Sequence, residues 1–324
     1  MRAWIVTDGK AGDELQCLAV AEALGITPEI RRIAPRAPFR WLAPYGPIDF
    51  RDRPRRLGSP IAPPFPDLLI GSGRRAVPYV RKVRRASRGW TYTVFLKDPV
   101  TGRRTADLVW VPEHDKLRAP NVIATITPPH RVSPERLAAA RAEPDPRLAA
   151  LPRPRVAVLV GGPSKHYPFD AEDAARFLAD IARLAETGVG LMATASRRTP
   201  AALRDGLANV IGRHAGFLWD GSGENPYIAA LALADAIVVT ADSYNMVGEA
   251  AATGAPILVF EPAGGHPKLK AFLRGLARYG AVKPFQGRLE AFSYEPLDST
   301  PTIAEAVREG LNRHRRALGL PESG

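Results

Sequence analysis

Two apolar, strand-like runs each end in a glycine loop that a ligand could approach. The first reads IVTDGKAGDE over residues 5–14, and the second reads VLVGGPSKHY over residues 158–167. Glycines let the backbone come close to a bound molecule, and the free amides at the start of a following helix attract phosphate. The residues offered in this way are Gly12 and Asp13 in the first loop and Gly161, Gly162, Ser164 and Lys165 in the second. The alternative for each loop is a tight structural turn.

Neither glycine loop matches a common nucleotide-binding fingerprint. The dinucleotide pattern G-x-G-x-x-G and the P-loop pattern G-x-x-x-x-G-K-[ST] are both missing, which disfavours a nicotinamide-dependent enzyme and a P-loop NTPase. A dehydrogenase or epimerase is disfavoured further because no Tyr-x-x-x-Lys pair lies near a plausible cofactor site.

A later segment, VVTADSYNMVGEAAATGAPILVFE over residues 238–261, carries a sharper signal. An apolar strand runs into a polar turn, and a helix of small residues then carries Glu249. The start of such a helix can hold a diphosphate, and a carboxylate on it can accept hydrogen bonds from ribose hydroxyls. The candidate ligand-binding residues are Asp242, Ser243, Asn245 and Glu249. An ordinary crossover helix capped by a serine is the alternative.

Two further polar groups follow apolar strands. Ser196 and Arg197 lie in TASRRTP, where Arg197 could neutralise a departing diphosphate without a metal. His114 and Asp115 lie in PEHD and are candidates for acid/base or orienting roles. One histidine among acids is too few ligands for zinc, so no metal site is predicted. Arg198 is assigned to solvent, and His166 and His266 receive no role.

Strand-like runs alternate with helical patterns along the whole chain, which predicts parallel sheets with crossover helices. Five strands are expected in each half, and proline and charge cluster between the halves at residues 143–155. We therefore expect two Rossmann-like, doubly wound α/β domains at residues 1–148 and 154–300. The amphipathic segment 301–324 is expected to pack back on the first domain. The proline-rich residues 51–66 are expected to form a surface loop.

Length and composition set further limits on the 324-residue chain. The single cysteine, Cys17, excludes a disulfide framework and a cysteine-based metal site. No apolar run approaches the roughly 18 residues that span a bilayer, and no signal sequence precedes the first strand. These features predict a soluble cytoplasmic protein.

Charge is distributed unevenly. Residues 31–118 hold 20 Lys and Arg against 7 Asp and Glu, a local excess of 13, whereas the whole chain has a net charge of +12. Such a field attracts an anionic membrane surface, a nucleic acid or an acidic substrate. Nucleic acid is disfavoured because the basic stretch lacks interleaved aromatics and zinc or helix-turn-helix patterns. A compositional preference for arginine is the alternative explanation.

The segment 238–261 resembles the donor half of the two-Rossmann glycosyltransferases of GT-B fold, which carry Ser or Thr, small residues, Glu-Ala and Gly-x-Pro in this order. The opening loop is similar to that of the lipid-linked N-acetylglucosamine transferases of peptidoglycan synthesis. In those enzymes Gly-Gly-Thr-Gly-Gly-His precedes LAVAE, the sequence of residues 18–22 here. Asp13 stands where they have histidine, and a carboxylate can act as general base for an acceptor hydroxyl.

A resemblance to another family covers nearly the whole chain. DGKAGDELQC, GSGRRAVPYVRKVRR, VFLKDP, DLVWVPEHD, GGPSKHYPF, TASRRTP, ENPY and TADSYNMVGEAAATG follow in this order. Together they are similar to the mitochondrial-fission family named after the plant elongated-mitochondria protein, which has many bacterial members. The resemblance implies a GT-B-like fold. For the plant member it also implies recruitment of a dynamin-related protein to the mitochondrial surface.

Two functions are compatible with these observations. In the first, a nucleotide sugar binds the second domain as donor substrate, an acceptor binds the first, and a cleft closes between them with Asp13, His114 and Asp115 as catalytic candidates. This metal-independent glycosyltransferase would need no cofactor and would act at or near the inner face of a membrane, where a lipid-linked acceptor is one candidate substrate. In the second, a non-catalytic adaptor sits on an anionic membrane through its basic half and gathers protein partners.

Overall fold

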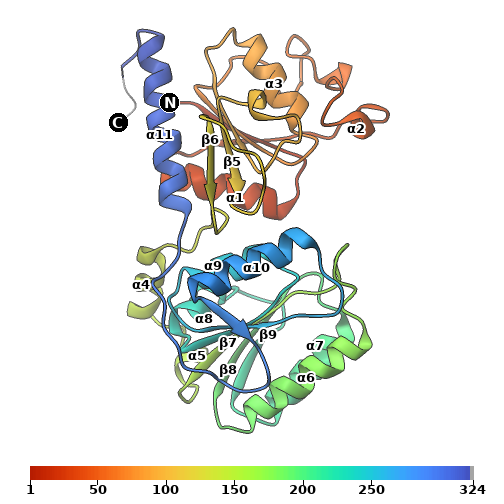
Figure 1. Cartoon of the computed structure of the whole chain (residues 1–324), viewed down its shortest axis with the longest axis vertical. Coiled ribbons are helices and arrows are strands. Elements are labelled where there is room, and N and C mark those ends of the chain that lie inside the picture. The colour runs from red at the N-terminus through yellow and green to blue at the C-terminus, as the bar shows by residue number, and fades with distance from the viewer. Residues whose placement is uncertain (322–324) are drawn as a thin grey trace. The chain divides into compact units, whose positions relative to one another are not determined.

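The computed structural model describes residues 1–321, which form two compact units (Figure 1). Unit 1 comprises Met1–Arg131 and the residues from Ser299 onward, and unit 2 comprises Val132–Asp298. Each unit is built around one parallel six-stranded sheet.

The sheet of unit 1 has the strand order β2-β1-β3-β4-β5-β6. The strands are β1 (Ala3–Thr7), β2 (Glu29–Arg32), β3 (Leu68–Ser72), β4 (Tyr92–Leu96), β5 (Leu108–Pro112) and β6 (Val122–Thr125). Every residue of β1, β3, β4 and β5 is buried. Helices cover both faces of this sheet, which is why these strands are continuous apolar runs in the sequence.

Helices α1 (Ala11–Ala23) and α11 (Thr300–Ala317) pack on one face of that sheet, and α3 (Val77–Ala86) packs on the other. The short helix α2 (Phe39–Leu42) and the 3-10 turns Phe50–Asp52 and Arg103–Thr105 lie in the connections. The sequence predicted that the first helix begins at Glu14. It begins at Ala11 instead, without a side-chain cap, so Gly12 and Asp13 lie in its first turn.

The sheet of unit 2 has the strand order β12-β11-β10-β7-β8-β9. The strands are β7 (Arg155–Val160), β8 (Gly190–Ala195), β9 (Gly216–Trp219), β10 (Ala236–Thr240), β11 (Ile257–Phe260) and β12 (Val282–Pro284). Helices α6 (Ala171–Ala185) and α7 (Ala201–Gly212) pack on one face through a shared apolar core. Helix α8 (Tyr227–Leu233) connects β9 to β10, and helices α9 (Tyr244–Ala251) and α10 (Pro267–Tyr279) follow β10 and β11 on the other side of β7 (Figure 1). Ligands of such sheets bind where the strands end, beside the reversal of strand order.

The chain divides at different residues from those expected. Helices α4 (Pro134–Ala142) and α5 (Pro146–Ala149) belong to unit 2, although residues up to 148 were assigned to the first domain. They pack against α8, where Arg141 Nε donates to the Ala232 carbonyl at 2.9 Å. The proline and charge cluster at 143–155 therefore lies within unit 2, between α4 and β7, and includes α5. The chain returns to unit 1 at Ser299, whose hydroxyl lies 2.7 Å from that of Thr127.

Candidate functional site

The two residues that follow β7, Gly161 and Gly162, must be glycine because neighbouring groups of the protein leave no room for a Cβ atom. The amide of Gly161 donates to Thr240 Oγ1 at 2.8 Å, and that of Gly162 donates to Asp242 Oδ2 at 3.0 Å. A Cβ atom at Gly161 would lie 2.1 Å from Asp242 Oδ2, and one at Gly162 would lie 2.3 Å from the Arg198 carbonyl oxygen. We expected these glycines to admit a ligand, but both amides already have partners inside the protein.

Asp242 holds together the loops that follow three neighbouring strands. Its side chain is fully buried and also accepts hydrogen bonds from Thr240 Oγ1 at 2.7 Å and Arg198 Nη2 at 2.8 Å. Arg198 Nη1 donates in addition to the carbonyls of Gly162 and Pro163 at 3.0 and 3.2 Å. The assignment of Arg198 to solvent was therefore wrong, because this side chain turns back to a buried carboxylate. Asp242 organises the site and has little capacity left for a ligand.

Two cations on the same loops extend away from these contacts. Lys165 and Arg197 are exposed, one after β7 and the other after β8. The hydroxyl of Ser164 is engaged locally, since it accepts from the amides of His166 and Tyr167 at 3.3 and 3.1 Å. Ser196 Oγ likewise accepts from the Arg198 amide at 3.2 Å. The serines therefore shape their loops, whereas the side chains of Lys165 and Arg197 are exposed to solvent.

Two histidines that the sequence analysis left without a role lie against one another. The ring centroids of His166 and His266 are 4.3 Å apart, and the Gly265 amide donates to the His166 carbonyl at 2.7 Å. Burial lowers the pKa of His166, and the nearby His266 and Lys165 lower it further. The loops that follow β7 and β11 thus meet at a pair of imidazoles, a proximity that sequence spacing could not reveal.

Glu249 lies on α9 beneath the turn that caps this helix. Ser243 is the N-cap, and its hydroxyl accepts from the Met246 amide at 3.4 Å. Tyr227, the first residue of α8, donates its hydroxyl to Glu249 Oε2 at 2.5 Å. Burial raises the pKa of Glu249 to about 7, although the hydrogen bond from Tyr227 opposes the rise. Asn245 is half-buried on the first turn of the same helix.

In unit 1, Asp13 is buried and forms an ion pair with Lys97, which follows β4. Gly73, after β3, has a φ of +92°, and a Cβ there would lie 3.0 Å from Asp13 Oδ2. Lys97 itself adopts a φ of +84°, which is strained for any residue other than glycine. The structure therefore brings the ends of three strands together around Asp13.

Asp8 is a second carboxylate in this cluster, and the sequence analysis did not select it. Its side chain is 2% exposed, and its Oδ2 lies 3.7 Å from both Lys10 Nζ and Arg75 Nη1. Its Oδ1 is buried and accepts no hydrogen bond within the part of the chain that the structure describes. The position of Asp8 at the end of a buried strand was the available signal.

His114 and Asp115 lie on the loop after β5. Strands β3 and β4 separate β5 from β1, so the strand ends are about 14 Å apart at the usual interstrand spacing. The Asp115 amide donates to the Pro112 carbonyl at 2.9 Å, and Arg118 Nη2 donates to the Glu113 carbonyl at 2.6 Å. These bonds fold the loop back on itself, some distance along the sheet edge from Asp13.

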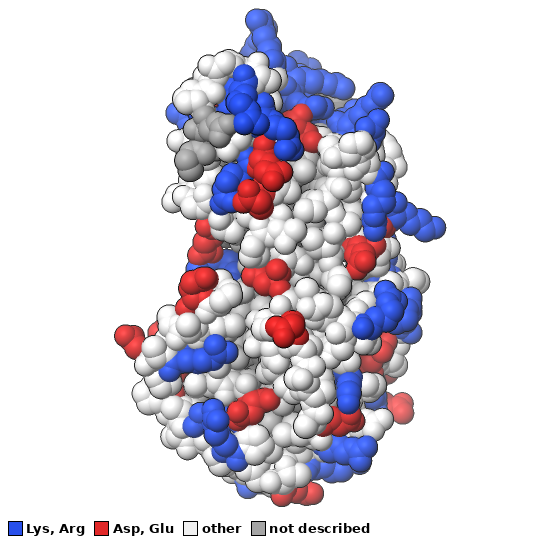
Figure 2. Space-filling view, turned by 60° about the vertical axis from the view of Figure 1, so that its left-hand side comes forward, with Lys and Arg blue, Asp and Glu red and all other residues white. Residues whose placement is uncertain are grey.

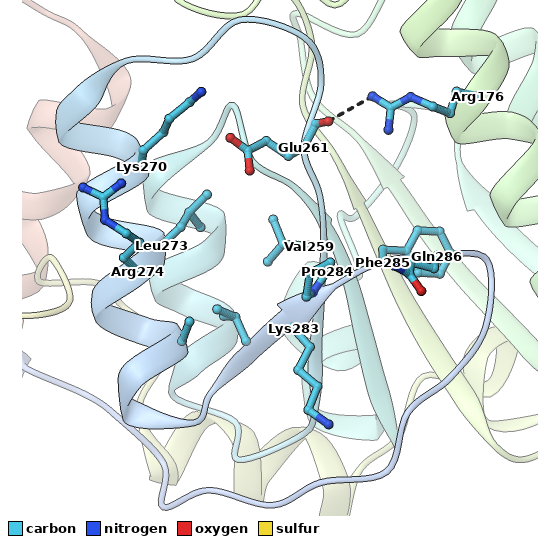
Figure 3. Close-up of a pocket in the computed structure, with 12 residues that line it drawn as sticks. Arg176, Val259, Glu261, Lys270, Leu273, Arg274, Lys283, Pro284, Phe285 and Gln286 are labelled. Carbon is cyan, nitrogen blue, oxygen red and sulfur yellow. Dashed lines mark hydrogen bonds between the residues drawn. The ribbon is translucent and has the colours of Figure 1, made fainter.

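A separate groove of about 630 Å³ lies between α10 and strands β11 and β12 (Figure 3). Lys270 and Arg274 extend from α10 on one side, and Arg176 donates to the Glu261 carbonyl at 2.9 Å on the other (Figure 3). None of the ligand-binding residues expected from the sequence lines this groove. Over residues 1–321, no helix is long and apolar enough to cross a bilayer, and no group of metal-ligating side chains is found.

Solved structures share this fold. A co-structure of S. aureus MnaA with UDP is 11% identical, with a TM-score of 0.55 over 100% of this chain and 98% of that chain. UDP-GlcNAc 2-epimerase from Methanocaldococcus jannaschii is 10% identical, with a TM-score of 0.55 over 95% of this chain and 99% of that one. MurG from Acinetobacter baumannii is 18% identical, with a TM-score of 0.50 over 98% of this chain and 95% of that one. The expected GT-B-like fold of two Rossmann-like domains is confirmed.

The fold is shared by epimerases as well as by glycosyltransferases. The missing dinucleotide fingerprint and Tyr-x-x-x-Lys pair disfavour only epimerases that depend on a nicotinamide cofactor. A UDP-GlcNAc 2-epimerase has a fold similar to that of this chain, so the fold alone does not distinguish an epimerase from a glycosyltransferase.

Sequence relatives agree with the resemblance. Mitochondrial fission protein ELM1 of Arabidopsis thaliana is 28% identical over 273 residues, which are 76% of this chain and 64% of the plant protein. The uncharacterized protein RP120 of Rickettsia prowazekii (strain Madrid E) is 32% identical over 165 residues, which are 48% of this chain and 46% of that protein. The chain thus spans less than two thirds of either relative. The family model described as Mitochondrial fission ELM1 matches residues 11–311, and the chain belongs to this family.

Proposed function

We propose that the chain is a metal-independent glycosyltransferase that takes a nucleotide sugar on unit 2 and acts at or near a membrane. The observation that carries this proposal is the placement of Glu249. It lies on the helix after β10, close to the edge of the sheet where ligands of such folds bind. Burial raises its pKa to about 7, so its ionisation is costly in the free protein.

A helix that serves only for packing gains nothing from a carboxylate in this place, because an apolar or amide side chain would cost less. A ribose presents two neighbouring hydroxyl donors, and an ionised carboxylate has two oxygens to accept them. Tyr227 engages one of these oxygens in the free protein. On nucleotide binding, the ribose hydroxyls would share or replace this bond. UDP in the S. aureus MnaA co-structure gives a plausible class of nucleotide.

The diphosphate has fewer candidate partners than expected, because the amides of Gly161 and Gly162 are occupied. In this proposal Lys165 and Arg197 contact the phosphates from the loops after β7 and β8. The first turn of α9, with Ser243 and Asn245, adds the positive end of the helix dipole. Cations of this kind stabilise the charge that develops on a departing diphosphate.

Unit 1 takes the acceptor in this proposal, and Asp13 is the general base. The acceptor oxygen forms a bond to the anomeric carbon, the bond from that carbon to the diphosphate oxygen breaks, and Asp13 receives the hydroxyl proton. Asp13 can do this only when Lys97 releases it or when the acceptor binds between them. His114 and Asp115 would orient the acceptor from the loop after β5.

Calorimetric titration of the full chain with UDP-, GDP-, ADP- and CMP-linked sugars tests donor binding. We expect one nucleotide class to bind, and Glu249→Gln to weaken binding by about tenfold or more. The matched control is Glu186→Gln, at an exposed glutamate at the end of α6, which should bind like the parent protein. Equal binding by Glu249→Gln, or no binding of any donor, would overturn the proposal.

Asp13→Asn separates chemistry from donor binding. It should leave the donor affinity unchanged and slow donor turnover by about a hundredfold, the usual contribution of a general base. Unchanged turnover would remove Asp13 from the mechanism.

A non-catalytic adaptor is the second candidate, and the ion pair of Asp13 with Lys97 is the observation that favours it. A purely structural loop would make the same contact. Under this alternative the chain docks on the cytoplasmic face of a membrane and gathers protein partners, and it binds no nucleotide sugar in the titration.

A further inference from the structure

Large apolar side chains are concentrated on one exposed segment of unit 1, residues 39–57. Trp41 is 64% exposed, Leu42 49%, Tyr45 69%, Phe50 52% and Leu57 fully exposed. Single exposed apolar residues are common on protein surfaces, whereas five within 17 residues indicate a contact surface. The sequence analysis placed part of this segment in an ordinary surface loop.

The segment is held firmly by the domain beneath it. Arg36 donates to Asp49 through Nε at 2.8 Å and through Nη2 at 2.6 Å, which lowers the pKa of Asp49. Tyr79 of α3 donates its hydroxyl to Asp52, and Ile61 is fully buried. The fold therefore holds the backbone in place while the apolar side chains point outward.

A basic pocket lies directly beside these side chains. It has a volume of about 380 Å³ and is lined by Tyr45, Gly46, Pro47, Ile48, Phe50, Arg53, Pro78, Arg81, Lys82 and Arg85. Four of its lining residues are cationic and none is acidic. The Arg53 guanidinium lies 4.6 Å from the centroid of the Phe50 ring, so the apolar and basic parts are in contact.

We infer that residues 39–57 and the outer face of α3 form a docking surface for a bilayer that contains anionic phospholipid. Trp41, Leu42 and Tyr45 enter the interface between headgroups and acyl chains, where Trp and Tyr are enriched in membrane-bound proteins. A lipid phosphate occupies the basic pocket, and the surrounding arginines meet neighbouring headgroups. This surface supplies the membrane contact of the proposed transferase. Its residues are separate from those of the proposed nucleotide-sugar site on unit 2.

The charge of unit 1 agrees with this assignment. Figure 2 shows Lys and Arg side chains gathered at the top and along one edge of unit 1, whereas the face of unit 2 in view carries both signs interleaved. Residues 31–118, which include the whole docking surface, hold the local excess of 13 positive charges. A negatively charged membrane surface would attract such a unit over about one Debye length.

The prediction that the basic stretch lacks interleaved aromatic residues was wrong. Phe39, Trp41, Tyr45 and Phe50 do interleave with arginines, so the basic stretch does not lack aromatic residues. Two observations nevertheless favour a bilayer over single-stranded nucleic acid. Leu42 and Leu57 offer no ring for base stacking, and Arg40 already lies over the Trp41 ring, 5.2 Å from its centroid.

Co-sedimentation of the full chain with vesicles tests this inference. We compare phosphatidylcholine vesicles with vesicles that also contain phosphatidylglycerol, at low and at high salt. The parent protein should bind the anionic vesicles and lose most of this binding at high salt. Trp41→Ser combined with Leu42→Ser should reduce binding by about tenfold or more, through loss of apolar insertion. Arg81→Gln combined with Arg85→Gln should reduce it by about thirtyfold, because two lost cations at about 1 kcal/mol each amount to about 2 kcal/mol.

Matched variants control for general effects of charge and apolarity. Arg213→Gln with Arg278→Gln removes two exposed cations from unit 2, and Leu15→Ser with Ile30→Ser removes two exposed apolar groups from elsewhere on unit 1. Both controls should sediment like the parent protein, and circular dichroism checks that every variant is folded. Because no nucleotide is present, failure of donor binding leaves this result unaffected.

Several outcomes would overturn the inference. The first is indifference to phosphatidylglycerol, and the second is equal sedimentation of the parent and the Trp41/Leu42 variant. Absence of vesicle binding, together with binding of single-stranded RNA that the same variants abolish, would reassign the surface to nucleic acid. Self-association that the variants abolish, again without vesicle binding, would reassign it to a second copy of the chain.

Discussion

The hydroxyl of Tyr227 donates a hydrogen bond to the carboxylate of Glu249, joining the first turn of α8 to α9. Burial disfavours the charged form of this carboxylate, so ionisation of Glu249 lowers the stability of the folded protein. Two expectations follow, one for stability and one for binding.

Glu249→Gln should stabilise the protein at alkaline pH. The folded-state pKa of Glu249 is raised to about 7 from 4.5. Below the unfolded value both states hold the proton, and the parent and the variant are equally stable. As the pH rises through this window, the unfolded state releases its proton first and the stability of the parent falls. The variant should therefore gain on the order of 3 kcal/mol at pH 8 and nothing at pH 4. Urea unfolding at both values measures the difference, and a gain independent of pH would contradict this account.

The affinity of the parent protein for the nucleotide sugar should rise with pH, whereas its stability falls. Below pH 7 the Glu249 carboxyl is protonated and has less capacity to accept hydrogen bonds from a ribose. We therefore expect the donor affinity of the parent to rise between pH 6 and pH 8, while that of Glu249→Gln stays flat. Calorimetry at three pH values distinguishes the two. Parallel profiles for parent and variant would show that another group titrates.

Asp242 and Arg198 should be energetically coupled. Asp242→Ala leaves the Arg198 guanidinium and the Gly162 amide without their acceptor, at a cost of about 3 kcal/mol. Arg198→Gln should cost about 1 kcal/mol, because that side chain is 43% exposed. Arg197→Gln is the control and should stay within about 0.5 kcal/mol of the parent. A double-mutant cycle of Asp242 and Arg198 by urea unfolding measures the coupling, and strict additivity would refute it.

Two glycine substitutions should have opposite effects. Gly161→Ala places a methyl group 2.1 Å from the Asp242 carboxylate and should destabilise by about 2 kcal/mol or more. At Gly212, in the last turn of α7, nothing lies within 4 Å of the added Cβ. Gly212→Ala should therefore stabilise by up to about 1 kcal/mol. Thermal melts of both variants test the contrast, and a harmless Gly161→Ala would show that the loop after β7 can move.

Much of the fold could be predicted because buried parallel strands appear in the sequence as uninterrupted apolar runs. β2, with the sequence EIRR, and β12, with VKP, were missed because they are short and polar edge strands. The early start of α1 was missed because its N-cap, Lys10, gives no capping signal. Helices α4 and α5 were assigned to the wrong unit because only their packing on α8 shows where they belong.

The candidate site could be predicted only in part. Residues directly after strands, such as Asp13 and Asp242, were selected because strand ends meet at one edge of a sheet. Their partners Lys97 and Arg198 come from other loops, 84 and 44 residues away in the chain. Pairing at such distances depends on the order of strands in the sheet. The spacing of residues along the chain does not reveal that order, so the hydrogen bonds that occupy the glycine amides could not be anticipated.

Unit 2 is inserted between the two parts of unit 1, because α11 returns to cover the face of the sheet on which α1 lies. During synthesis, all of unit 2 emerges from the ribosome before α11 does. The core on this face of the sheet is incomplete until α11 is made, because it combines Cys17, Val20 and Ile70 with Ile303, Val307 and Leu311 of that helix. The unit that starts first is thus the last to finish, and a nascent chain would expose this half-covered face until then.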